Sequence, residues 1–219
     1  VPDAAQATWI AVVGSDAAGD AVVALVAGSH VAAQAQASHA LIDLTKRAST
    51  LDFAGVKAQR VLSGDKVASA IRDYLLLGAL LTAAEAVGST SACLAGIVDY
   101  LKTRKQFGKL IGSFQALKHP TVDIYVDMEH SRSLVYHASS EIDDGPLSTE
   151  AEVACRMAKA KASDTIQYAG DRSVQFHGGF GFTWECDSSL FIRRAAWSQQ
   201  QFGDAMHHRK RLAPLLLDS

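Results

Sequence analysis

One long segment, residues 65–104, reads as a single helix and limits the folds open to this chain more than any other feature. Three further segments have helical apolar periodicity, at about 115–144, 148–175 and 185–217, and Gly-rich or polar connections join them. Helices of this length predict an antiparallel four-helix bundle. Because the first segment is apolar on nearly every side, we expect it in the middle of that bundle.

The residues before position 63 have a different pattern. Short apolar runs of strand-like composition alternate with Gly, Ser and Asp turns, at 8–13, 21–26, 40–44 and 51–56. These runs predict a small antiparallel β module. The chain is therefore expected to have the α+β class, with the module at 1–63 and the helical domain at 64–219.

Helix boundaries and one basic cluster carry weaker signals. Asp65 can cap the first helix, and Thr149 with Glu152 forms the pattern of a capping box. The adjacent His207 and His208 precede three basic residues, which indicates a solvated helix face.

Composition excludes several classes of function. A formal net charge of −2 over 219 residues gives no global attraction for nucleic acid or an anionic membrane, so any anion site must be local. Cys93, Cys155 and Cys186 form no C-x-x-C pair, which argues against structural zinc and a disulfide scaffold and favours a reducing cytoplasm. The apolar run 75–94 contains a glutamate and two glycines, which suits a buried soluble helix better than a membrane span, and no signal peptide is visible.

The connection RKQFGKLIGSFQ, residues 104–115, carries more charge and aromatic surface than a link between two helices needs. It interleaves Arg104, Lys105 and Lys109 with phenylalanines and glutamines. A guanidinium pairs well with phosphate oxygens, and aromatic faces suit a planar ring. The segment therefore predicts a site for a flat, anionic ligand. For Arg104 alone, the alternative is a solvated cation stabilised by the dipole at a helix C-terminus.

A second informative stretch, VQFHGGFGFTWE at 174–185, lies between two predicted helices. Gly178, Gly179 and Gly181 let the backbone approach a ligand, and N–H groups at such a junction can hold phosphate oxygens. A dinucleotide-binding βαβ unit is not indicated, because these glycines follow a helix rather than a strand. The alternative is a glycine-terminated helix and a tight turn. His177 is either a polar contact for the ligand or a histidine bonded to the backbone.

In this order, RKQFGKLIGSFQ, QFHGGFGFTWE and the later FIRRA resemble the C-terminal half of the acyl-CoA dehydrogenase family of flavoproteins. The resemblance covers most of the chain, with 1–63 as a partial β domain, and the GGFGFTWE segment is similar to heteromeric actinobacterial members that act on steroid side-chain thioesters. It implies FAD as cofactor and α,β-dehydrogenation of an acyl-CoA thioester. Family members generally carry a helical domain ahead of the β domain, so a partner or a longer chain would complete the acyl pocket.

The resemblance also assigns the cofactor site. It implies that the arginine of the R-x-x-F-G motif and the residues after it contact the diphosphate and adenine of FAD, often across a subunit interface. It also implies that the Q-x-x-G-G segment meets the same cofactor from the partner subunit. The positions that it points to in this chain are Arg104, Gln106, Phe107, Phe114, Gln115, Gln175, Gly178 and Gly179.

The catalytic base is the position at which this chain departs from the family. The reaction needs a carboxylate that removes the α-proton while the β-hydride goes to the flavin. One place where relatives carry a glutamate holds Phe202 here. The other, about seven turns before Arg104, falls at Gly78 or Ala79. Asp204 is the nearest carboxylate and the candidate base, with N-capping of a last helical segment as the alternative.

Asp73 and Glu185 are weaker candidates for the base. Three functions remain open: a complete dehydrogenase subunit, a partner subunit that lacks the base and joins a catalytic chain, and a helical interaction protein without flavin. The first two imply an acyl-CoA substrate, a related subunit in a homo- or hetero-oligomer, and an electron-accepting flavoprotein. No metal is expected.

Overall fold

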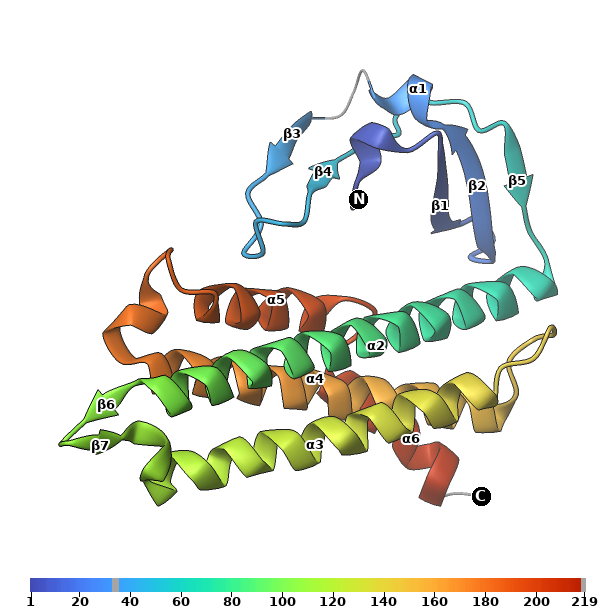
Figure 1. The fold of residues 1–219 in the computed structure, drawn as a ribbon. Helices are drawn as coiled ribbons and strands as arrows, with labels where there is room; N and C mark the ends of the chain where they lie inside the picture. Colours follow the sequence, from blue (N-terminus) through green and yellow to red (C-terminus); the bar gives the residue numbers. More distant parts are fainter. Residues whose placement is uncertain (33–35, 218–219) are drawn as a thin grey trace. The chain divides into compact units, whose positions relative to one another are not determined.

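Helices make up most of the chain, and a small antiparallel sheet lies near its N-terminus (Figure 1). The structure is a computed structural model that describes residues 1–32 and 36–217. The chain divides into two compact units, Val1–Tyr74 and Leu75–Ser219, and the long helix α2 (Asp65–Thr103) belongs to both. The predicted combination of a small antiparallel β module with long helices is confirmed.

The first unit contains two small sheets. Its elements are η1 (Ala4–Gln6), β1 (Trp9–Ser15), β2 (Ala21–Ala27), α1 (Gly28–Ala32), β3 (Gln36–His39), β4 (Ala48–Thr50) and β5 (Arg60–Leu62). Strands β1, β2 and β5 form one antiparallel sheet in that order, and β3 pairs with β4. The β1–β2 turn is stabilised by the Asp16 carboxylate, which accepts from the N–H groups of Ala18 and Asp20.

Two of the predicted strands are wrong, because 40–44 and 51–56 form turns and irregular backbone. In the first, Oδ1 of Asp43 accepts from both the N–H and the hydroxyl of Thr45, at 3.0 and 2.7 Å. In the second, Oδ1 of Asp52 accepts from the N–H of Ala54 at 2.9 Å. These local side-chain bonds compete with strand pairing and turn the backbone.

The second unit holds the helices that follow. After α2 come β6 (Lys105–Gln106), β7 (Lys109–Leu110), η2 (Ile111–Ser113), α3 (Gln115–Ser140), α4 (Thr149–His177), η3 (Gly178–Phe182), α5 (Ser188–Gln200) and α6 (Ala205–Leu217). The predicted single segment 185–217 is therefore divided into two helices. Phe202 and Gly203 have φ of 56° and 97°, and this left-handed pair ends one helix before the next begins.

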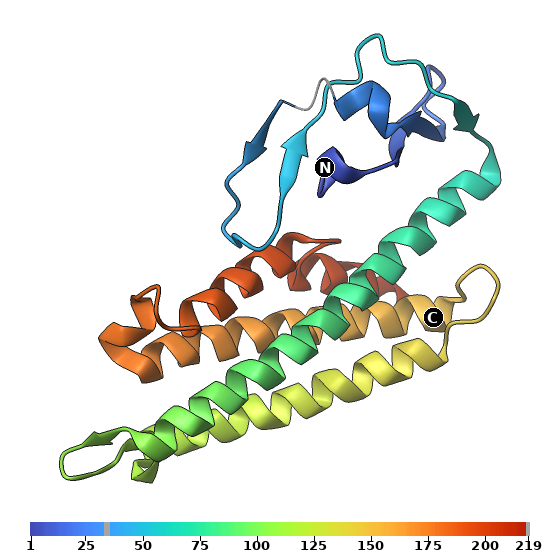
Figure 2. The same ribbon diagram turned by 45° about the horizontal axis from the view of Figure 1, so that its top comes forward.

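The helix α4 is the central helix of the second unit. It contacts α3, α5 and α6, and Figures 1 and 2 show it running alongside its neighbours. Ala154, Ala158 and Ala162 are all buried, and such small side chains let several helices approach closely. The expectation that 65–104 occupies the middle is wrong, because α2 leaves Leu81 largely exposed.

Within the described residues, α2 is the one helix long and apolar enough, by length and composition, to cross a membrane. The core helix of a soluble protein passes the same test. Leu76 and Leu80 of α2 are buried in one apolar cluster of the second unit, and Cys93 and Ile97 are buried in another. These contacts place one side of α2 in the apolar clusters of the second unit.

Candidate functional site

A tight hairpin, β6–β7, joins the end of α2 to the start of α3. Its two central residues, Phe107 and Gly108, have φ of 53° and 73°, as a two-residue hairpin turn with right-handed strand twist requires. A left-handed backbone is uncommon for an aromatic residue. The Phe107 side chain is also 90% exposed, so no buried contact explains why the position is aromatic.

The base of the hairpin is held against the end of α2. The N–H of Ile111 donates to the carbonyl of Arg104 at 2.9 Å. Gly112 is required here, because a Cβ at this position would lie 2.7 Å from the carbonyl oxygen of Leu101. Phe114 then stands edge to face with Phe107, with ring centroids 6.3 Å apart.

The end of α4 and the 3-10 turn η3 form a second wall. Gly178 caps α4 with φ of 61°, a conformation that favours glycine. No atom lies within 4 Å of a Cβ built on Gly178 or Gly179, so both face open space. At Gly181 a Cβ would lie 2.6 Å from the carbonyl oxygen of Val174, so η3 packs directly on the last turn of α4.

His177 is fixed between these two walls. Its Nδ1 lies 2.8 Å from the carbonyl oxygen of Ser173 and 2.9 Å from Oγ of Ser188. The ring of Tyr100, from α2, stacks on the imidazole with centroids 4.2 Å apart. Both alternatives for His177 are thus compatible with the structure, since the residue bonds the backbone and also lines the pocket.

The walls enclose a surface pocket of about 770 Å³. It is lined by Tyr100, Arg104, Gln106, Phe107, Ile111, Phe114, Leu117, Gln175, Phe176, His177, Gly178, Gly179 and Phe180. All the predicted cofactor residues are therefore brought together except Gln115, which is exposed at the start of α3. Sequence reasoning missed Tyr100, because an aromatic residue four positions before Arg104 has the ordinary spacing of a helix face.

Arg104 is the one Lys or Arg among the described residues that line the pocket, and no Asp or Glu lines it. Its guanidinium has no hydrogen bond or ion pair with any residue in the described part of the chain. A pocket lined by both an unpaired guanidinium and open glycine backbone suits a phosphate group.

Gly78 and Phe202, the two positions at which a catalytic glutamate was expected, lie against each other. A Cβ built on Gly78 would be 2.3 Å from Cε1 of Phe202, so the phenyl ring fills the space above the glycine. Asp204 follows in the α5–α6 turn, where its Oδ1 accepts from the N–H of His207 at 2.7 Å. Asp204 does not line the pocket described above.

The weaker base candidates lie elsewhere. Asp73, in the first unit, pairs with Arg72 at 2.8 Å, and Glu185 is exposed. Over residues 1–32 and 36–217, no group of three or more His, Cys, Asp or Glu side chains is arranged to hold a metal ion.

A buried polar cluster beneath the α5–α6 turn was not expected from the sequence. Lys159 is 1% exposed, and its Nζ donates to Oγ of Ser163 at 2.9 Å and to the carbonyl of Ser198 at 3.0 Å. Burial lowers the pKa of Lys159 to about 8, although the Asp204 charge opposes this. The small residues on the helix face around Lys159 are the only feature of the sequence that could have indicated its burial.

His208 belongs to the same cluster, so its predicted place on a solvated face is wrong. The side chain is 2% exposed, and Nε2 lies 3.0 Å from the carbonyl oxygen of Phe202. Burial, followed by the charge of Lys159, lowers the pKa of His208 to about 4. The ring is therefore neutral at pH 7, and its Nε2–H donates to Phe202.

Residues 68–214 match the family model described as acyl-CoA dehydrogenase, C-terminal domain. The acyl-CoA dehydrogenase IpdE2 of Mycolicibacterium smegmatis is 39% identical over 134 residues, which are 61% of this chain and 40% of that protein.

Two solved structures show the same fold at low identity. The ChsE4-ChsE5 complex from Mycobacterium tuberculosis superposes with a TM-score of 0.83 at 24% identity, covering 97% of this chain and 56% of that one. A variant of the Tcur3481-Tcur3483 steroid ACAD gives a TM-score of 0.84 at 24% identity, covering 100% of this chain and 57% of that one. This chain spans less than two thirds of the length of each of these three proteins.

Proposed function

Because the chain belongs to the acyl-CoA dehydrogenase family, we propose that it forms part of an enzyme that uses FAD to dehydrogenate an acyl-CoA thioester between its α and β carbons. One observation carries the proposal: a single pocket is lined both by unpaired Arg104 and by the open backbone of Gly178 and Gly179. The family is generally FAD-dependent, and bound FAD would supply the acceptor for the substrate hydride. In this proposal residues 64–219, in which the fourth predicted helix is divided into α5 and α6, are the flavin-binding domain that follows a partial β domain at 1–63.

The residues present fit an adenine dinucleotide. The Arg104 guanidinium would hold the diphosphate through charge-assisted bonds, and the glycine backbone would let the same phosphates approach closely. Phe107 and Phe114 offer edge and face surfaces to a planar ring. Gln106, Gln115 and Gln175 would bond the polar edges of the cofactor, with Gln115 reaching it only where a second chain closes the site.

The first form of the proposal is a complete enzyme subunit in which Asp204 removes the α-proton. The Asp204 carboxylate is exposed and its second oxygen is available for a proton, which supports this role. The same carboxylate also caps α6, so a purely structural role would account for its position equally well.

The second form is a partner subunit that lacks a base of its own. Packing of the Phe202 ring on Gly78 favours it, because a phenyl group and a glycine occupy both places at which a glutamate was expected. The base would then come from a related chain in a heteromer. A helical interaction protein without flavin remains the least supported alternative, because it leaves the unpaired Arg104 and the open glycines without a use.

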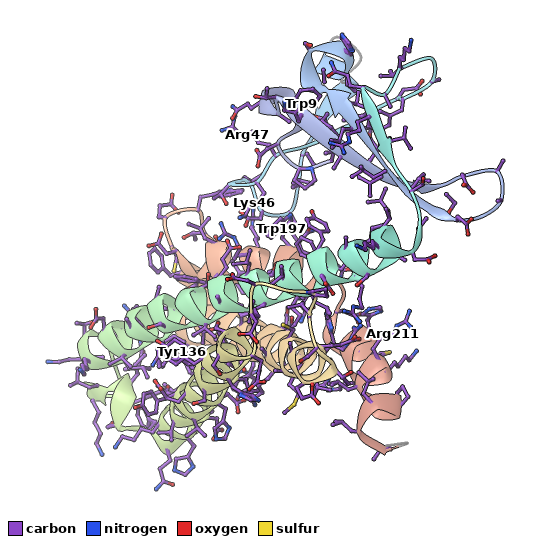
Figure 3. The ribbon with its side chains drawn as sticks, turned by 90° about the vertical axis from the view of Figure 1, so that its right-hand side faces the viewer. Trp9, Lys46, Arg47, Tyr136, Trp197 and Arg211 are labelled. Carbon is purple, nitrogen blue, oxygen red and sulfur yellow. The ribbon has the colours of Figure 1, made fainter. Side chains whose placement is uncertain are left out.

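A related subunit is also supported by an exposed apolar stripe on α3. Val122, Tyr125 and Tyr136 are spaced along one side of that helix and are exposed, with Tyr136 at 69% (labelled in Figure 3). The ChsE4-ChsE5 structure is named as a complex of two proteins, and the Tcur3481-Tcur3483 protein is named a steroid ACAD. We therefore propose a steroid-derived acyl-CoA substrate, a heteromeric assembly, and an electron-accepting flavoprotein. Three free, buried cysteines support a reducing cytoplasm as its location.

The FAD assignment is tested by the substitution Arg104→Ala. Loss of a charge-assisted bond to phosphate is expected to weaken FAD binding by about tenfold or more. The matched control is Arg211→Ala, which removes an exposed arginine from α6 (Figure 3), outside the pocket. FAD occupancy is measured from the flavin absorbance of the purified proteins and affinity by titration. Equal occupancy in both variants would overturn the assignment.

A further inference from the structure

Lys159 is a buried charge that the packing of the second unit does not require. Its side chain is 1% exposed on α4, where the neighbouring Ala158 and Ala162 are also buried. Among residues 1–32 and 36–217, no carboxylate forms an ion pair with its ammonium. A buried charge without such a partner costs folding free energy, and an apolar side chain would pack in its place at lower cost. The lysine therefore indicates a role other than packing.

The ammonium of Lys159 bonds the end of α5. Nζ donates to Oγ of Ser163, one turn farther along α4, at 2.9 Å, and to the carbonyl of Ser198, in the last turn of α5, at 3.0 Å. The carbonyl groups of a last helical turn lack amide donors within the helix and carry partial negative charge, so they favour a cation. The N–H of Gln201 also donates to the Ser198 carbonyl, at 3.2 Å. Lys159 thus fixes the point at which α5 ends and the chain turns toward α6.

A second buried side chain holds the other side of the α5–α6 turn. The Nε2–H of His208 donates to the carbonyl of Phe202 at 3.0 Å. Phe202 and Gly203 are both left-handed, a conformation that a phenylalanine keeps only where the surroundings impose it. Asp204 follows directly, and its Oδ1 accepts from the N–H of His207 at 2.7 Å. The place of the Asp204 carboxylate therefore depends on where α5 ends.

We propose that Lys159 is a positioning residue, which holds the α5–α6 turn through the Ser198 carbonyl and thereby sets where the Asp204 carboxylate lies. The ammonium supplies a donor to the end of α5 and a positive charge that attracts Asp204. The catalytic part of this inference rests on the proposed function, in which Asp204 is the candidate base. The geometry of the turn does not depend on that function and can be measured in the chain without FAD.

Methionine is the substitution that isolates this role. Lys159→Met keeps a flexible side chain of similar volume, but it can neither donate to Ser198 nor attract Asp204. A lysine that only stabilised the unit would be missed in global unfolding, whereas a positioning lysine would be missed in the turn. The matched control is Lys161→Met, two positions along α4, because the Lys161 ammonium pairs with Asp127 of α3 rather than with the turn.

Amide hydrogen exchange of the purified chain measures the geometry of the turn, and the His207 N–H reports on its bond to Asp204. We expect Lys159→Met to speed exchange at residues 201–207 by about tenfold or more, because loss of a charge-assisted bond frees the end of α5. The midpoint of denaturant unfolding is expected to stay the same or to rise, since a buried charge has been removed. Lys161→Met should leave exchange at 201–207 as it is in the wild type.

Turnover by the assembled enzyme shows whether the lysine acts through Asp204. The values of kcat and KM for a straight-chain acyl-CoA are measured in Lys159→Met, in Asp204→Asn and in the double variant. If Lys159 positions the carboxylate, its substitution lowers kcat only where Asp204→Asn does, and the double variant is no slower than Asp204→Asn. FAD occupancy should be unchanged in all three, because neither residue lines the pocket.

The possible failures of the inference and of the proposed function can be told apart. Unchanged exchange at 201–207 in Lys159→Met would overturn the inference and leave the proposed function standing. A fall in kcat that persists undiminished in the Asp204→Asn background would also overturn it, since the lysine would then act elsewhere. A wild-type chain that binds no FAD would instead overturn the proposed function, and the exchange measurement would still decide the role of Lys159 in the turn.

Discussion

Asp204 and Phe202 are two residues apart, but they make different kinds of contact. The Asp204 carboxylate accepts from the first turn of α6, and the Phe202 ring covers Gly78. Phe202 also has φ of 56°, a conformation that costs an aromatic residue free energy and is kept only where the surroundings impose it. The carbonyl of Phe202 bonds His208, which is part of what holds the turn.

The substitution Asp204→Asn separates capping from catalysis. Asparagine caps a helix about as well as aspartate, so the free energy of unfolding is expected to stay the same. If Asp204 is the base, turnover of the assembled enzyme falls by about 10²–10⁴-fold, because an amide cannot accept the α-proton. Steady-state kinetics with an acyl-CoA, alongside denaturant unfolding, measures both effects. Full activity in this variant would place the base at a carboxylate other than Asp204.

At the scale of elements, helix positions were predictable and helix boundaries were not. The capping box expected at Thr149 and Glu152 is wrong, since Ser148 caps α4 by accepting from the N–H of Ala151. Glu152 pairs with Arg156 instead. Several polar residues in a row can each cap a helix, and the backbone path entering the helix decides which one does.

His208 is buried where α6 packs on α4, and this burial makes the free energy of unfolding depend on pH. Its pKa is lowered from 6.5 to about 4, so the unfolded chain binds more protons than the folded one between these values. The stabilisation is fully present above pH 6.5 and is lost as the pH falls toward 4. Between pH 6.5 and 4, protonation of His208 is expected to lower the free energy of unfolding by on the order of 2–3 kcal/mol.

Denaturant unfolding at several pH values between 7 and 4 measures this dependence. His208→Gln should flatten the curve, because glutamine does not titrate and can still donate to the Phe202 carbonyl. His119→Gln, which replaces an exposed histidine of α3, is the control and should keep the wild-type slope. An unchanged slope in His208→Gln would assign the pH dependence to other groups.

At the scale of the whole molecule, the question is whether this chain can complete the reaction. The chain covers 40% of the IpdE2 relative and 56% of one chain of the ChsE4-ChsE5 structure, so part of a full-length acyl-CoA dehydrogenase lies outside it. The pocket at the end of α2 and α4 is built wholly from the second unit. In the proposed function, cofactor binding and proton removal can therefore be tested separately.

Anaerobic addition of steroid-derived and straight-chain acyl-CoA thioesters to the flavin-loaded chain tests the complete enzyme directly. Because Phe202 and Gly78 leave no glutamate at either expected place, we expect the flavin absorbance band to persist when the chain is alone. Bleaching is expected after a related subunit is added. Bleaching without that subunit would mean that Asp204 or another carboxylate of this chain is a working base.

Local patterns in the sequence were enough to predict the long helices, to single out the motifs at 104–115 and 174–185, and to show that positions 78 and 202 lack a glutamate, because helical periodicity, glycine and charge are local properties of the chain. Three features could be seen only in the folded chain: the two motifs line one pocket, Phe202 lies on Gly78, and His208 is buried rather than solvated. Each of these depends on which faces of separate helices meet. That choice is made by packing the whole unit around α4, and no local pattern contains it.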